Sequence, residues 1–352
     1  MVEIRINNIM YEAKDGETIL NIAEREGISI PTLCHKNDLP HYSSCMVCMV
    51  KDNNSNGYVP SCSALVQTGM DIDASGTDVL SLRKKAVELL LSEHRAECEA
   101  PCRIVCPAGL NVPLMNRLLA EGKIDAAIML SSCESGSNES PCINCPAYCE
   151  NACRRKKIDI PVSIRNLQLF ISGKLSPENS GLHTENKART KEKRFTSLIG
   201  KLEPEEQMEW LKECPGDTPR FRDIFSSESS FSESMSCMHC DCRAANDCRL
   251  RDIAEDFKLK DPRGKLVNAP AVKKINLHTN LIFENAKCIK CGLCVRISEA
   301  ENEEHPLCFM NRGFISIISE PLTSEFVETM KTTSKECIEI CPTGALAYFK
   351  NY

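Results

Sequence analysis

Cysteines in recurrent short spacings are the residues of this chain that could do chemistry. The sequence has 352 residues and 23 cysteines, a proportion below that of short secreted proteins held together by disulfides. A chain of this length can bury apolar cores without covalent crosslinks. We therefore interpret most of the cysteines as metal ligands rather than as disulfide partners.

The first group of cysteines lies near the N-terminus. Its members are Cys34, Cys45, Cys48 and Cys62. Four thiolates can complete the iron tetrahedra of a 2Fe-2S cluster, and a zinc ion held by the same four thiolates is the alternative.

The segment around this group has the pattern of a small mixed domain. Alternating apolar residues from Val2 and a second apolar run at residues 9–11 predict a hairpin. A helix should follow, with Thr18 as its N-cap and Gly27 at its end. The cysteine spacing and this pattern make residues 1–76 similar to the N-terminal ferredoxin domain of the large iron–sulfur subunit of NADH dehydrogenase (complex I) and of iron-only hydrogenases. The resemblance implies a β-grasp fold with one 2Fe-2S cluster.

The second group follows a predicted helix over residues 77–93. Up to Cys98 the sequence resembles the complex I subunit, in which a helix ends in a histidine followed by cluster-binding cysteines; His94 is that histidine here. From Cys98 to about residue 172 it resembles the helical two-cluster domain of the glutamate synthase small subunit and dihydropyrimidine dehydrogenase. In that family each 4Fe-4S cluster takes ligands from both ends of the domain.

The second resemblance implies a specific assignment of ligands. One cluster would use Cys98, Cys102 and Cys153, and the other Cys106, Cys145 and Cys149. Each set lacks a fourth cysteine. His94 is the candidate for the first cluster, against the alternative of a helix-end histidine that contacts the last carbonyls. Gln168 is the candidate for the second, because dihydropyrimidine dehydrogenase has a ligating glutamine there, against the alternatives of a solvated glutamine or of ligation by Cys133 or Cys142.

A third group follows a serine-rich stretch and resembles no family that we identify. Its members are Cys237, Cys240, Cys242 and Cys248. They could hold a 4Fe-4S cluster or a structural zinc ion. The presence of the other groups favours iron.

The last group is Cys288, Cys291 and Cys294 with the later Cys341, which precedes a proline. It resembles the two-cluster ferredoxin domain of iron-only hydrogenases and complex I, which implies that these four cysteines bind one 4Fe-4S cluster. The second site of that family is degraded, since Ser298 stands where one of its cysteines belongs. Besides Cys142, four cysteines have no assigned cluster: Cys133, Cys214, Cys308 and Cys337. The expected role of Cys308 and Cys337 is that of a buried thiol.

These patterns predict an α+β, multidomain chain. Its parts are a β-grasp 2Fe-2S ferredoxin domain, an α-helical 4Fe-4S domain, a linker or a strap over the surface, a four-cysteine segment and a bacterial ferredoxin-like C-terminal domain. The predicted boundaries are residues 1–76, 77–173, 174–236, 237–261 and 262–352.

Charge and missing motifs narrow the function. Residues 1–80 hold 5 Lys and Arg against 11 Asp and Glu, which equals the net charge of −6 of the whole chain. Such an acidic domain suits a basic partner surface, and no basic patch suits nucleic acid. The first residues lack the hydrophobic core of a signal peptide, and no apolar run is long enough for a membrane span, so we expect a cytoplasmic protein. No Gly-rich dinucleotide motif or P-loop occurs, so we expect no flavin or NAD(P) in this chain.

The sequence therefore predicts a relay subunit that performs no bond chemistry itself. It would carry one 2Fe-2S cluster and three to four 4Fe-4S clusters in a hetero-oligomeric oxidoreductase. The expected partners are a flavoprotein NAD(P)H-oxidoreductase subunit and a catalytic subunit of the hydrogenase or formate dehydrogenase type. One alternative is a regulatory or scaffold protein with structural or redox-sensing metal sites. Another is an enzyme that binds substrate at an incompletely ligated cluster near Gln168.

Overall fold

A computed structural model describes residues 2–94, 98–135, 140–173, 219–224, 226–244, 247–259 and 272–350. Most of the predicted linker lies outside these residues, as do Cys214 and the side chain of Cys133. The chain divides into two units. The first comprises Met1–Arg95, Asp247–Pro270 and Lys274–Phe349, and the second comprises Ala96–Asn246, Ala271–Lys273 and Lys350–Tyr352.

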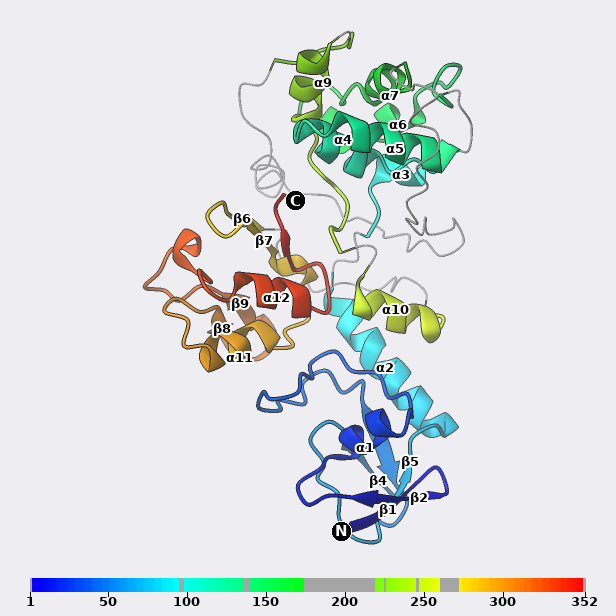
Figure 1. The fold of residues 1–352 in the computed structure, drawn as a ribbon, viewed down its shortest axis with the longest axis vertical. Helices are drawn as coiled ribbons and strands as arrows, with labels where there is room; N and C mark the ends of the chain where they lie inside the picture. Colours follow the sequence, from blue (N-terminus) through cyan, green and yellow to red (C-terminus); the bar gives the residue numbers. More distant parts are fainter. Residues whose placement is uncertain are drawn as a thin grey trace. The chain divides into compact units, whose positions relative to one another are not determined.

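The N-terminal part of the first unit is a five-stranded sheet with one helix against it (Figure 1). The strand order is β2-β1-β5-β3-β4, with β1 antiparallel to β2 and parallel to β5. The strands are β1 Val2–Ile6, β2 Ile9–Ala13, β3 Met49–Asp52, β4 Gly57–Pro60 and β5 Asp71–Asp73. Alternate strand residues such as Ile4, Ile6 and Ile72 are fully buried beneath the helix, as expected for a sheet with one face on the core.

The helix in this domain is α1, Ile19–Arg25. Thr18 Oγ1 accepts a hydrogen bond from the Asn21 amide at 3.2 Å, and the Asn21 side chain accepts one from the Thr18 amide. Gly27, just beyond the helix, has a positive φ of 70°, which glycine adopts without steric cost. The predicted hairpin, N-cap and helix end are therefore confirmed, and these elements fix the loop that carries the first cysteines.

The rest of the first unit contains the helix α2, Thr77–Glu93, and a C-terminal part of short strands and helices (Figure 1). Arg83 on α2 donates to the Met49 carbonyl at 2.8 Å and so fastens the helix to β3. The remaining helices are α10 Arg249–Asp256, α11 Leu293–Ala300 and α12 Ser334–Ile340, with short 3-10 turns at Asn285–Lys287, Gly313–Ile315 and Phe326–Glu328. The strands are β6 Lys273–Asn276, β7 Leu281–Glu284, β8 Cys308–Met310, β9 Ile317–Ser319 and β10 Leu346–Tyr348.

The second unit is helical in its described residues (Figure 1). Its helices are α3 Pro101–Ile104, α4 Val112–Ala120, α5 Ile124–Ser135, α6 Tyr148–Asn151, α7 Ile164–Ser172 and α9 Ser227–Ser234, with a 3-10 turn at Arg154–Lys157. Apolar residues of α4, α5 and α7, among them Leu119, Ala127 and Leu167, form its core. The fold is thus α+β with several domains, as predicted.

The serine-rich stretch, which the sequence placed in the linker or strap, is a helix that packs on its neighbours. Ser226 caps α9, and the helix packs against α4 and α7. Ser230 and Ser234 are buried, and their hydroxyls donate to carbonyls of the same helix at 2.8 Å. Because these hydroxyls are satisfied within the helix, serine can take the place of alanine at a close helix contact.

Within the described residues, no helix combines the length and the apolar character that crossing a bilayer requires.

Candidate metal centres

The N-terminal cysteines form two close pairs. Cys34, Cys45 and Cys48 lie on the loop between α1 and β3, and Cys62 follows β4. All four are at most 4% exposed. The hydrogen bond from the Cys45 thiol lowers the pKa of Cys34 to about 5, and the bond from the Cys48 thiol lowers the pKa of Cys62 to about 7. A 2Fe-2S cluster takes two protein thiolates on each of its two irons, so the pairing fits that cluster.

The loop around these cysteines supplies further polar groups. The hydroxyl of Ser43 lies 3.6 Å from Cys62 Sγ. Ser43 and Met46 both have positive φ values, 48° and 55°, which is uncommon for residues with a side chain. The backbone thus curls tightly around the four thiols, as in a site built to enclose an inorganic group.

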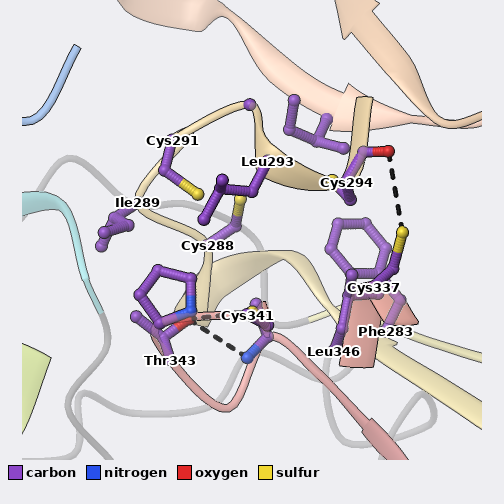
Figure 2. A pocket seen from close by; sticks show the side chains of 14 residues that line it. Phe283, Cys288, Ile289, Cys291, Leu293, Cys294, Cys337, Cys341, Thr343 and Leu346 are labelled. Atoms are coloured by element: carbon purple, nitrogen blue, oxygen red, sulfur yellow. Dashed lines mark hydrogen bonds between the residues drawn. The ribbon is translucent and has the colours of Figure 1, made fainter. Parts of the chain in front are cut away.

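The C-terminal domain brings its four predicted ligands to one pocket. Cys288, Cys291, Cys294 and Cys341 line it together with Cys337. Figure 2 shows the sulfur atoms of Cys288 and Cys291 turned toward the same space. The amide of Lys290 donates to Cys288 Sγ at 3.3 Å. Apolar side chains such as Phe283 and Leu293 complete the lining. Burial raises the pKa of the Cys288 thiol to about 12. The thiol therefore gives up its proton, and becomes a thiolate ligand, only beside a cationic partner.

Cys337 has a different role in the same pocket. Its thiol donates to the Cys294 carbonyl at a sulfur to oxygen distance of 3.7 Å (Figure 2). It is fully buried, and burial raises its pKa to about 12. This agrees with the predicted role of a buried thiol. The same prediction is wrong for Cys308, which is only partly buried at the start of the short strand β8.

Polar side chains meet where the sequence predicted a degraded second cluster. The hydroxyls of Ser298 and Thr333 lie 3.3 Å apart. The Glu303 carboxylate accepts hydrogen bonds from the amides and hydroxyls of Thr332 and Thr333 at 2.7 to 3.1 Å. These groups satisfy one another, which supports a single cluster in this domain.

One pocket of the helical unit gathers four predicted ligands and one of the alternative ligands. Cys106, Cys145 and Cys149 line it together with Cys142 and Gln168. The Gln168 side-chain oxygen accepts a hydrogen bond from the Ser131 hydroxyl at 3.0 Å. This hydrogen bond uses one of the two acceptor positions of that oxygen. Cys142 is the fourth cysteine at this pocket, and burial raises the pKa of its thiol to about 11.

A second pocket of the helical unit groups cysteines differently from the sequence assignment. Its cysteines are Cys102, Cys153, Cys237 and Cys240. Cys98, which the resemblance placed with Cys102, is not among the residues that line it. The physical reason is the packing of α9 on α4 and α7, which brings the residues directly after α9 to the pocket of Cys102 and Cys153. No local spacing signals this contact.

An ion pair fixes the segment that carries Cys240. The Arg117 guanidinium donates to both carboxylate oxygens of Asp241, at 2.7 and 2.9 Å. Both side chains are less than a tenth exposed. Burial alone would raise the pKa of Asp241, but the Arg117 charge outweighs this and holds that pKa far below its usual range. The pair is bidentate and desolvated, the geometry in which an arginine orders its partner most strongly.

The remaining predicted ligands are not part of these pockets. The imidazole Nδ1 of His94 hydrogen-bonds to the Lys287 carbonyl at 2.8 Å, and burial lowers the pKa of His94 to about 4. Its neutral ring therefore donates from Nδ1 and keeps an acceptor at Nε2, the tautomer of a metal-binding histidine. In the helical unit, the Cys242 amide donates to the Cys98 carbonyl at 3.3 Å. In the first unit, the Cys248 thiol donates to the Pro342 carbonyl at 3.6 Å. Of the third group, Cys237 and Cys240 line the second pocket of the helical unit.

Comparisons with known families match the N-terminal and helical domains. Residues 1–76 match the family described as a 2Fe-2S iron-sulfur cluster binding domain. Residues 86–179 match the family described as dihydropyrimidine dehydrogenase domain II, 4Fe-4S cluster. The resemblances of the N-terminal and helical domains are confirmed, and the chain carries a 2Fe-2S domain and a 4Fe-4S domain.

Curated relatives share part of the chain. The 75 kDa subunit of NADH-ubiquinone oxidoreductase of Reclinomonas americana is 29% identical over 35% of this chain and 17% of its own length. The gamma subunit of the NAD-reducing hydrogenase HoxS of Cupriavidus necator is 30% identical over 28% of this chain and 41% of its own length. The aligned regions thus span less than half of these relatives.

A solved structure has a similar fold over nearly the whole chain. A chain of an NAD+-reducing [NiFe]-hydrogenase in the H2-reduced state aligns with 99% of this chain and 87% of its own length. The TM-score is 0.53 and the sequence identity 16%, so this likeness concerns the fold.

Proposed function

We propose that this chain is a multi-cluster iron–sulfur electron-transfer subunit of a cytoplasmic oxidoreductase complex. It relays electrons between a flavoprotein subunit that reacts with NAD(P)H and a catalytic subunit of the hydrogenase or formate dehydrogenase type. Bound clusters supply one-electron carriers, and the chain's own residues hold them, bury them and set their potentials. The observation that carries the proposal is that buried and partly buried cysteines gather around several separate sites in both units.

Four cluster sites are supported by this geometry. The paired thiols of the N-terminal domain suit a 2Fe-2S cluster. The C-terminal pocket and the two helical pockets each suit a 4Fe-4S cluster, with Cys142 as the fourth ligand of one helical site. We propose the other helical site for Cys102, Cys153, Cys237 and Cys240. His94, Cys98, Cys242 and Cys248 stay proposed ligands outside these four sites.

The second candidate function is that of a regulatory or scaffold protein. The number of proposed cluster sites makes this function less favoured than a relay. A sensor needs one responsive cluster, and a scaffold is served equally well by zinc. The relatives are named as subunits of NADH-ubiquinone oxidoreductase and of a NAD-reducing hydrogenase, and that context favours a relay. The acidic N-terminal domain is the proposed docking face for one partner.

Metal analysis of the anaerobically purified full chain tests the proposal. The four sites predict about fourteen irons per chain with matching acid-labile sulfide, and a total near eighteen would indicate a fifth cluster. Reduced samples should show overlapping cluster signals in EPR, and the isolated chain should not reduce a dye with NAD(P)H. A chain that contains mostly zinc, or that oxidises NAD(P)H alone, would refute the relay.

Replacing Gln168 by leucine should leave the iron content unchanged. Its side-chain oxygen already accepts from Ser131, and Cys142 completes the set of four cysteines at that pocket. The loss of one buried hydrogen bond should cost about 1 to 3 kcal/mol of unfolding free energy. Iron content and urea unfolding measure the two effects. The comparator is Cys142→Ala, which should lose about four irons. Loss of iron in the Gln168 variant with retention in the Cys142 variant would assign the fourth ligand to the glutamine.

A further inference from the structure

Arg296 joins the backbones of two proposed cluster sites in the first unit. It lies on α11 and is 1% exposed. Its Nη2 donates to the carbonyl of Cys34 at 2.6 Å, and the Cys291 carbonyl lies 3.5 Å from the same nitrogen. Cys34 belongs to the 2Fe-2S set and Cys291 to the C-terminal set. One guanidinium therefore contacts the peptide groups of ligands from both sites.

The other contacts of Arg296 hold the same junction. Its Nη1 donates to the Pro40 carbonyl and its Nε to the Gly292 carbonyl. The aromatic ring of Tyr42 lies 4.8 Å from the guanidinium carbon, in the geometry of a cation–π contact. All of these partners lie on the loop of the first cysteine set or on the segment of the last, so the arginine connects the two ligand loops.

The loops are close-packed where they meet. Gly292 has a φ of 72°, and a methyl group at its Cα would lie 3.2 Å from the rings of Tyr42 and Phe309. The Ser44 hydroxyl donates to the Cys291 carbonyl at 3.4 Å, and Lys36 forms an ion pair with Glu336. The approach of the two sites is therefore a built contact with several independent attachments.

The charge of Arg296 has no carboxylate partner within the part of the chain that the structure describes. None of the ion pairs among those residues includes Arg296. A buried guanidinium that is paired only with neutral carbonyls costs free energy. Iron–sulfur clusters held by four thiolates are anionic, and two of them at this junction would supply the missing countercharge.

We propose that Arg296 is the positioning residue that sets the contact between the 2Fe-2S site and the C-terminal 4Fe-4S site, and that its charge raises the reduction potentials of both clusters. This rests on the proposed function, because both sites must carry their clusters. A reduced cluster has one more negative charge, so a fixed positive charge nearby favours reduction. The step at this contact moves one electron: one cluster is oxidised as the other is reduced, and no proton or atom is transferred.

Redox titration of three variants of the full chain tests this role. Arg296→Met replaces the charged guanidinium by an apolar end. Arg296→Lys keeps the positive charge but loses the planar guanidinium that donates to several carbonyls. Arg312→Met removes the same charge from an exposed position of the same domain. The midpoint potential of the 2Fe-2S EPR signal and the magnetic broadening of that signal by the reduced 4Fe-4S cluster are the readouts.

The expected result separates charge from position. Arg296→Met should lower the 2Fe-2S midpoint potential and weaken the broadening, whereas Arg312→Met should change neither. Arg296→Lys should restore most of the potential but not the broadening. Unchanged potential and broadening in Arg296→Met at full iron content would overturn the inference while leaving the relay intact. Wild-type chain without these clusters would instead refute the proposed function itself.

Discussion

Replacing Cys102 or Cys237 by alanine should remove about four irons per chain in each case, and the double variant should also lose about four rather than eight. The expectation follows from the pocket that these two residues share with Cys153 and Cys240. Removal of one ligand leaves a 4Fe-4S cluster open to solvent, and the cluster dissociates. Removal of a second ligand of the same cluster therefore causes no further loss of iron. Iron and sulfide content of the purified variants measures the effect.

A matched pair of variants makes that test decisive. Cys106 lines the other helical pocket, so the double variant of Cys106 and Cys237 should lose about eight irons. If Cys102 and Cys237 together also lost eight, they would belong to different clusters, and the assignment that places Cys98 with Cys102 would be restored. The comparison therefore chooses between the grouping seen in the structure and the grouping implied by the sequence.

The variant Asp241→Asn should lower the unfolding free energy by about 3 to 5 kcal/mol, because it leaves the Arg117 guanidinium buried without a countercharge. It should also release the segment next to Cys240 and so lose the cluster of that pocket. Denaturant unfolding of the anaerobic full chain and its iron content are the measurements. Asp223→Asn, at an exposed position of the same unit, is the control and should change neither.

A second substitution distinguishes the buried charge from the lost hydrogen bonds. Combining Asp241→Leu with Arg117→Met removes both charges and should recover part of the lost stability. No recovery would mean that the carboxylate acts by some route other than its pairing with Arg117.

The pH dependence of the ion pair follows from the pKa of Asp241. That pKa lies far below its unfolded value. Its contribution to stability is therefore fully present above the unfolded pKa and is lost only as the pH falls through the folded value. The contribution of the pair should thus persist through neutral and mildly acidic solution.

Short-range spacing in the sequence determined the sites whose ligands lie on one loop or one domain. Two sets show this, Cys34 to Cys62 and Cys288 to Cys341. Within each set, the helices and strands between the cysteines are short and are specified by neighbouring residues, so the cysteines of the set come together. The N-cap at Thr18 and the positive φ at Gly27 are properties of neighbouring residues, and the structure has both as predicted.

Only the tertiary structure decided the grouping in the helical unit and the contact at Arg296. Cys237 lines the same pocket as Cys102 because α9 packs against α4 and α7. The serine-rich sequence of α9 gives no sign that one of its faces is buried. Gln168 is turned toward Ser131 by helix packing, and the bond from Arg296 to Cys34 joins residues at opposite ends of the chain. The spacing of the cysteines shows which thiols could act as ligands. Which of these thiols come together in one pocket depends on packing between elements that are far apart in the sequence.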